Sequence, residues 1–205
     1  MAILLALAAL AAPSPVSKLI LQPSQVGSGY VLLQRRDGVG VKNTVTLDLC
    51  GRNGYPSERL RIARLQVNYL KLGSRLGLSN EVVRYTPGGA AQAMREAARH
   101  AASCPHRPIE TGEPGLPPLR FTISRIRDSK LLKGYVAVRV RVRGTVKGKQ
   151  VDEISYAIYQ RFGNVLSGVY SFGPNTSAQL RFALHAAEES AKNLRRGGGG
   201  SGPTA

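Results

Sequence analysis

One stretch constrains the fold more than any other, namely residues 135–172, which read YVAVRVRVRGTVKGKQVDEISYAIYQRFGNVLSGVYSF. Valine alternates with alanine or arginine from Val136 to Arg143, and a period of two is typical of a strand with one buried face. The segments KGK (147–149) and GN (163–164) are typical of hairpin turns. The sequence therefore predicts three antiparallel strands in a meander.

Similar patterns predict the other elements of the fold. Two helices are expected, at about 89–103 and 177–195, because small or apolar residues recur there at the spacing of one helical face. Further strands are expected at 43–49, 59–72, 81–86 and 119–126. With 205 residues the chain can bury one core, so we expect a single α+β domain with a twisted antiparallel sheet and two main helices. The domain is expected to cover residues 18–196, and the Gly-rich tail 197–205 is expected to be flexible.

The stretch YTPGGAAQAM (85–94) has two interpretations. Glycines ahead of a helix can form a phosphate site, or they can simply let the chain turn from a strand into a helix. Ala90 and Ala91 stand at the head of the helix, where a phosphate loop would carry Lys and Ser or Thr. The sequence therefore favours a structural joint.

The N-terminal run MAILLALAALAA, followed by the helix-breaking APSPVS, is typical of a secretory signal. The run is shorter than the roughly 20 apolar residues that span a bilayer. We interpret residues 1–17 as a signal-like or clipped anchor segment, the alternative being a buried N-terminal strand or helix. A secreted or envelope-associated, extracytoplasmic protein is expected.

Export bears on the two cysteines, Cys50 and Cys104. An even pair outside the reducing cytosol is usually a disulfide. A metal site is the alternative, because HAASCPH places His100, Cys104 and His106 close together, but no fourth ligand is apparent. No metal and no cofactor are expected.

The chain has 29 Lys and Arg against 12 Asp and Glu, which gives a formal net charge of +17. Such a charge predicts attraction to polyanions, with anionic lipid, a cell-wall polymer or an unidentified small ligand as partners. Nucleic acid is not expected in an exported protein, although Tyr156 and Tyr159 could in principle stack on bases. The candidate anion-binding residues are Arg139, Arg141, Arg143, Lys147 and Lys149.

The sequence gives no support for an enzyme. It contains neither a G-x-S-x-G elbow nor an H-E-x-x-H helix. Asp152 and Glu153 are neighbours in a predicted strand and should point to opposite faces, so they do not form an acid and base pair. No catalytic residue is assigned.

Two segments, LDLCGRNGYPSERLRIARLQVNY (47–69) and EVVRYTPGGAAQAMREAARHAASCP (81–105), precede the meander and the closing helix. In this order the chain resembles, over residues 18–196, actinobacterial secreted sensor-like domains related to the extracellular domain of PknH-type receptor kinases. The resemblance implies an α+β domain outside the membrane, a ligand cleft beside a twisted sheet, and a disulfide between Cys50 and Cys104.

We therefore expect a non-enzymatic, extracellular sensor-like domain that binds an anionic or amphiphilic ligand. The alternative is a basic envelope-adhesion module without a defined pocket. A pocket lined by both arginine and apolar side chains favours the first function, and a flat basic surface favours the second.

Overall fold

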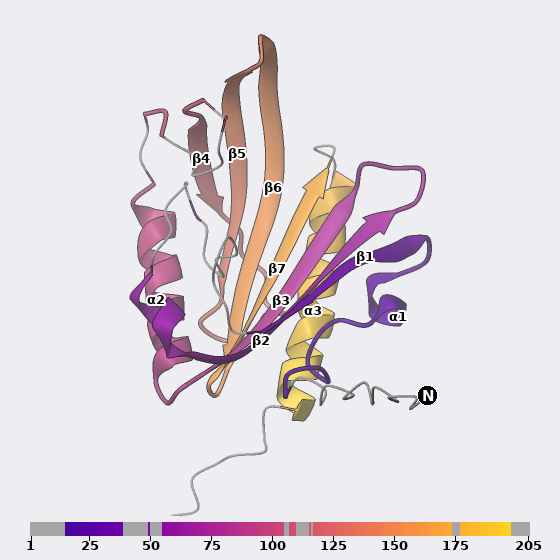
Figure 1. Cartoon of the computed structure of the whole chain (residues 1–205), viewed down its shortest axis with the longest axis vertical. Coiled ribbons are helices and arrows are strands. Elements are labelled where there is room, and N and C mark those ends of the chain that lie inside the picture. Colours follow the sequence, from indigo (N-terminus) through magenta and orange to yellow (C-terminus); the bar gives the residue numbers. More distant parts are fainter. Residues whose placement is uncertain are drawn as a thin grey trace, which may run out of the picture.

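The computed structural model describes residues 15–38, 49, 55–104, 107–109, 115, 117–173 and 177–197. These residues form one seven-stranded sheet in the order β1-β2-β3-β7-β6-β5-β4, with all neighbouring strands antiparallel (Figure 1). The strands are β1 Tyr30–Asp37, β2 Arg61–Lys71, β3 Gly77–Tyr85, β4 Arg120–Arg125, β5 Val136–Val146, β6 Lys149–Phe162 and β7 Val165–Gly173. The helical elements are α1 Pro23–Val26, the 3-10 helix η1 Pro56–Leu60, α2 Gly89–Ala102 and α3 Ser177–Gly197. The predicted single α+β domain is confirmed.

The predicted meander is formed by β5, β6 and β7. Its turns lie at Lys147–Gly148 and Gly163–Asn164, as the sequence predicted. Lys147 and Gly163 both have positive φ, of 48° and 56°, which suits tight hairpin turns. Strand β7 then pairs with β3, so the meander is joined edge to edge with the β2–β3 hairpin in one sheet.

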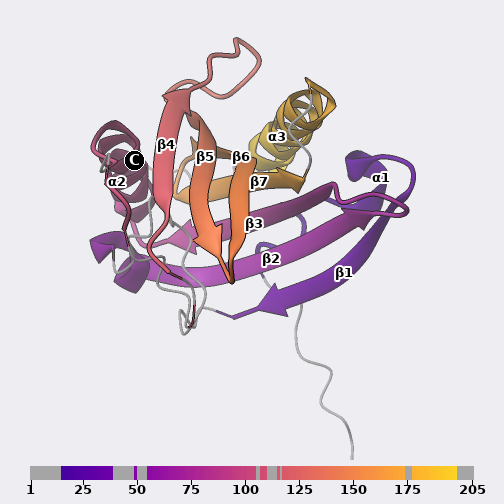
Figure 2. The same ribbon diagram turned by 90° about the horizontal axis from the view of Figure 1, so that it is seen from above.

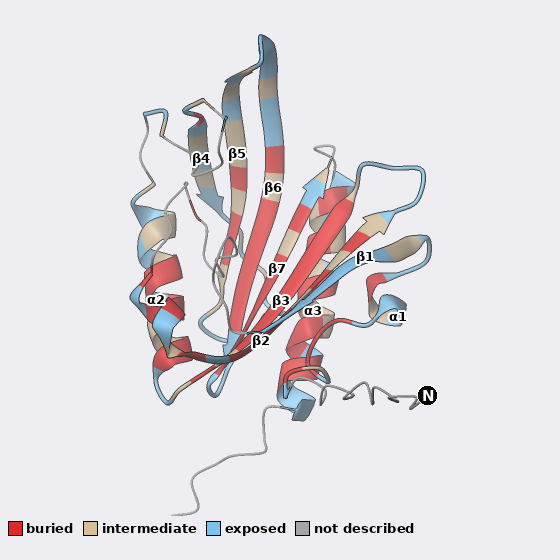
Figure 3. Ribbon diagram, viewed as in Figure 1, coloured by how far each residue is buried: buried red, intermediate tan, exposed pale blue. Residues whose placement is uncertain are grey.

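Helices cover the two faces of the sheet. Residues of α3 pack with one cluster of buried apolar side chains, and residues of α2 pack with a second cluster on the opposite face. Seen from above, α2 and α3 lie on either side of strands β4 to β7 (Figure 2). Burial is greatest along β3 and β7, in the centre of the sheet (Figure 3).

The chain ahead of α1 belongs to the core on the α3 side. Val16, Leu19 and Leu21 are at most 2% exposed. Asn80 of β3 fixes this segment, because its Oδ1 accepts the backbone N–H of Leu21 at 2.9 Å. The start of the domain at residue 18 stays a prediction. Val16, two residues before that boundary, also packs in the core.

Some predicted features differ from the structure. Strand β1 was not predicted from the sequence, and the strand expected at 43–49 lies outside the described residues except for Leu49, which is buried. The helical spacing of the sequence predicts Glu96 on the polar side of α2, and this prediction is wrong. It is buried because Ser57 of η1 packs over it and donates a hydrogen bond from Oγ to Glu96 Oε2 at 2.5 Å.

The Pro-Gly-Gly segment is a structural joint. Gly88 has φ 80° and forms the N-cap of α2, and a Cβ at Gly89 would lie 2.8 Å from the Cβ of Tyr85. Gly88 supplies the left-handed conformation and Gly89 the close approach of helix to strand.

The joint can be tested with substitutions at Gly88. A Cβ there meets no atom within 4 Å, so any loss of stability comes from the backbone conformation alone. Gly88→Val should lower the free energy of unfolding by about 1 kcal/mol or more, whereas Gly88→Asn should cost less because asparagine tolerates positive φ. Urea denaturation measures both, and a valine variant as stable as the asparagine variant would contradict the assigned conformation.

Candidate ligand pocket

A pocket of about 230 Å³ opens between the C-terminal half of α2 and the adjoining ends of β4 and β5. It is small, equal to roughly eight water molecules at about 30 Å³ each. A ligand of a few heavy atoms, or the head of a larger one, would fill it. The lining residues are Ala98, Ala101, Arg125, Ile126, Arg127, Tyr135, Val136 and Ala137.

The strand ends and the connection between them place the polar side chains of the pocket. Arg125 is the last residue of β4, and the N–H of Ile126 still bonds to the carbonyl of Ala137 at 2.9 Å. The chain then leaves the sheet and returns at Tyr135, whose N–H bonds to the carbonyl of Leu132 at 3.1 Å. Both strand ends are therefore held by backbone hydrogen bonds.

Tyr135 also fixes the connection through its side chain. Its hydroxyl accepts the backbone N–H of Asp128 at 2.9 Å, which leaves the hydroxyl proton available to donate. The Asp128 carboxylate in turn accepts the N–H of Lys130 at 2.8 Å. The one acid in this connection is thus engaged with backbone.

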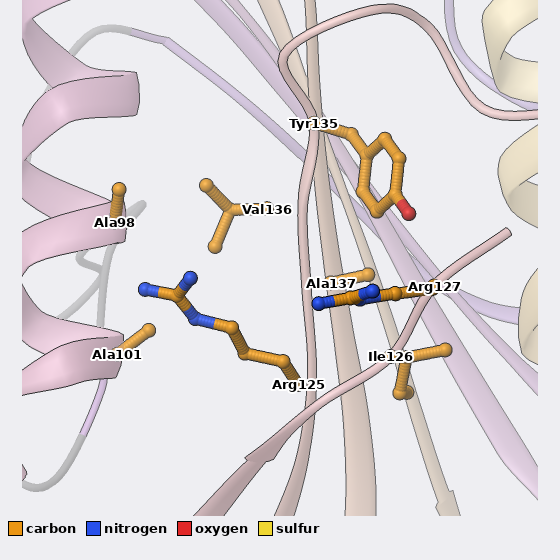
Figure 4. Close-up of a pocket in the computed structure, with 8 residues that line it drawn as sticks. All are labelled: Ala98, Ala101, Arg125, Ile126, Arg127, Tyr135, Val136 and Ala137. Carbon is orange, nitrogen blue, oxygen red and sulfur yellow. The ribbon is translucent and has the colours of Figure 1, made fainter.

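Two guanidinium groups dominate the charge of the pocket. Figure 4 shows Arg125 extending toward Ala98 and Ala101 of α2, and Arg127 extending across Ala137. Neither arginine forms an ion pair with any residue that the structure describes. Both are exposed at the pocket mouth, where a ligand anion could bind them.

The walls of the pocket are apolar. Ala98 and Ala101 contribute only methyl groups from α2, and their small size leaves the space open. Ile126 and Val136 add larger aliphatic surface. Arginine and apolar side chains line one pocket, which is the arrangement that the sequence analysis associated with a ligand-binding domain rather than with a flat adhesive surface.

These pocket residues do not stand out in the sequence. Arg125 ends a short strand with a weak pattern, Arg127 lies beyond its end, and Tyr135 precedes β5. Only the fold brings them near α2. The spacing of two residues between the arginines carried no signal, because Arg127 is outside the strand.

The anion-binding candidates named from the sequence lie elsewhere. Arg139, Arg141 and Arg143 share the face of β5 opposite to Val138 and Val140, as predicted. Lys147 and Lys149 lie at the β5–β6 turn and are exposed.

Asp152 of β6 is the acid that meets this basic face. It accepts two hydrogen bonds from Arg141, at 2.7 and 2.5 Å. These bonds, together with the charges of Arg141, Arg143 and Arg139, lower the pKa of the Asp152 carboxyl. Glu153 pairs with Val142 on the other face, so Asp152 and Glu153 do point apart as predicted.

The tyrosines considered for base stacking are not available for it. Tyr156 is 5% exposed in the core beneath α3, and Tyr159 is fully buried on the α2 side. The structure thus places them on opposite faces of β6, in the two cores.

The alternative metal site is only partly within the described residues, because His106 lies outside them. His100 forms a hydrogen bond through Nδ1 with the hydroxyl of Tyr55. In the part of the chain that the structure describes, no three His, Cys, Asp or Glu side chains are grouped so as to hold a metal ion. Within the same part, no helix is long and apolar enough to cross a membrane.

A second polar group of side chains lies on the α2 face of β2 and β3. Arg64 is 3% exposed and is paired with Glu81, which is 1% exposed. Arg64 also donates to Gln66 Oε1 at 2.6 Å, and Gln66 donates to Ser79 Oγ at 2.9 Å. This internal network satisfies a buried charge pair.

Comparison with known proteins supports the fold. No family model matches the chain, and no curated protein matches it. Among solved structures it is similar to the extracellular domain of PknH from Mycobacterium tuberculosis, with a TM-score of 0.55 and 14% sequence identity over 86% of this chain and 94% of that one. The chain has the fold of that extracellular domain. The resemblance seen in the sequence is confirmed at the level of the fold, and an actinobacterial origin stays a prediction.

The disulfide also stays a prediction, because Cys50 lies outside the described residues. Cys104 packs against the core on the α2 side, and no described cysteine is free.

Thiol titration of the unfolded, unreduced protein should find no free thiol. Cys104→Ser should lower the free energy of unfolding by about 2–5 kcal/mol, the usual contribution of a native bridge in a small secreted domain. Two titratable thiols would contradict the pairing with Cys50.

Proposed function

We propose that this chain is a non-enzymatic, sensor-like domain that works outside the cytoplasm and binds a small anionic ligand with an apolar body. The pocket beside α2 is the binding site. Arg125 and Arg127 contact the anionic group, and the alanines of α2 with Ile126 and Val136 contact the apolar part.

The composition of the pocket is the observation that carries this proposal. Two arginines that form no ion pair with any described residue line a small space with aliphatic walls. A carboxylate or phosphate in this space can accept charge-assisted hydrogen bonds from a guanidinium group. A ligand that is only charged would leave the aliphatic walls uncovered, and one that is only apolar would leave the arginines unpaired.

Two further observations support the extracytoplasmic part of the proposal. The sequence begins with an apolar, signal-like run, and the fold is that of an extracellular receptor-kinase domain. We therefore propose that the chain is secreted or associated with the cell envelope.

The ligand class can be tested by calorimetry with octyl phosphate as the probe. The parent should bind octyl phosphate more tightly than octanol or inorganic phosphate, because only the first supplies both the anion and the apolar chain. Arg125→Gln/Arg127→Gln should weaken binding by about tenfold or more, equivalent to about 1.4 kcal/mol. Glutamine keeps hydrogen-bonding capacity and removes the charge.

Two controls separate the pocket from the general positive charge. Arg36→Gln/Arg75→Gln changes the charge equally at exposed positions away from the pocket and should leave binding unchanged. Ala98→Leu keeps every charge but fills the pocket from half-buried Ala98, and should weaken binding. If Arg125→Gln/Arg127→Gln binds octyl phosphate like the parent, the pocket is not the site.

A further inference from the structure

A row of arginines lies on the α3 face of the sheet, whereas Arg125 and Val136 of the pocket lie on the α2 face. Arg139, Arg141 and Arg143 alternate along β5, and Arg120 of β4 stands directly across from Arg143. Residues two apart on a strand are about 7 Å apart, so the β5 arginines form a line of evenly spaced charges. We call these four residues the arginine row.

The positive charge of the arginine row is only partly compensated. Asp152 is the one acid among the described residues that forms an ion pair with it, and it is held by Arg141. Arg120, Arg139 and Arg143 have no ion pair with any described residue. Adjacent like charges repel unless an anion binds between them.

Part of the arginine row is open to solvent because α3 covers only part of this face. Arg120 and Arg143 are exposed, and Arg139 and Arg141 are half-buried. Gln179, in the first turn of α3, donates to the carbonyl of Ile154, so the helix begins beside that residue. Beyond it the β5–β6 hairpin projects past the rest of the sheet (Figure 1), and its outer part is largely exposed (Figure 3). Lys147 and Lys149 add two charges at the tip of the hairpin.

The surroundings of the row distinguish between two kinds of anionic partner. Surface helices and loops that bind membranes combine basic residues with apolar side chains that enter the lipid. In the part of the chain described, no exposed large apolar side chain lies on β4, on β5 or at the 147–149 turn. A line of charges without exposed large apolar neighbours suits a flexible, linear polyanion.

We infer that the arginine row and the tip of the β5–β6 hairpin form a second binding surface, for a linear polymer that carries phosphate or carboxylate groups. Each arginine contacts one anionic group of the polymer through charge-assisted hydrogen bonds. The pocket residue Arg125 stands across from Val138 on the α2 face, and of the pocket residues on β5 only Ala137 shares the face of the row. The chain would thereby be held on an anionic matrix while the pocket remains open.

The experiment measures binding of the full chain to long-chain inorganic polyphosphate and to polygalacturonate over a series of salt concentrations. The parent should bind at least one polymer, with affinity that falls steeply as salt is added. The test variant is Arg120→Gln/Arg139→Gln/Arg143→Gln, which leaves the Arg141–Asp152 pair intact. It should bind at least about tenfold more weakly at low salt, and the slope of log affinity against log salt should flatten by about 2, since each lost phosphate contact removes about 0.7.

A matched variant, Arg36→Gln/Arg75→Gln/Arg196→Gln, removes the same charge at exposed positions away from β4, β5 and the start of α3. It should keep the affinity of the parent. Asp152→Asn frees Arg141 and should raise the affinity several-fold. Circular dichroism establishes that all variants are folded.

Three results would overturn the inference. The first is a parent that binds neither polymer. The second is a matched variant that loses as much affinity as the test variant, which would make the effect one of overall charge. The third is tighter binding to vesicles of equal parts phosphatidylcholine and phosphatidylglycerol than to either polymer, with that binding lost in the test variant, which would make the partner a membrane.

Discussion

The burial of β3 and β7 on both faces is the constraint on which the rest of the structure depends. Eight of the nine residues of β3 are buried, from Gly77 to Val83 and again at Tyr85. A strand in this position needs a cover on each side, which α2 and α3 supply. The helices cover less of the sheet toward its β4 edge, and the pocket and the arginine row lie near that edge.

Burial of the central strands on both faces requires that their polar groups find partners inside the protein. Asn80 is fully buried and bonds to Leu21, to the Ser167 hydroxyl and to the Gly168 carbonyl. Ser167 in turn bonds to Ser190 of α3 at 2.6 Å. These bonds link the N-terminal segment, the centre of the sheet and α3.

The sequence predicted those elements whose pattern is local. The meander and both main helices could be predicted because periods of two and of 3.6 residues arise from the backbone geometry of a single element. Strand β1 was missed because most of its residues are exposed and show no alternation. The burial of Arg64 could not be predicted, since its partner Glu81 comes from another strand and only the register of β2 with β3 brings them together. The pocket was missed for the same reason, because Arg125, Tyr135 and Ala98 come from three elements.

The pocket and the arginine row both attract anions, and they differ in what surrounds the charge. Aliphatic walls accompany Arg125 and Arg127, whereas the row has Thr122 and Ser124 beside it on β4, and its apolar neighbours on β6, Ile154 and Tyr156, are buried. A nuclear magnetic resonance titration of the labelled protein with octyl phosphate separates the two sites directly. The account predicts saturable shifts of the backbone amides of Ala98, Ala101, Tyr135 and Val136, with little change at Arg141 and Arg143. Shifts confined to the β5–β6 hairpin, or spread evenly over all basic surfaces, would contradict the pocket as the ligand site.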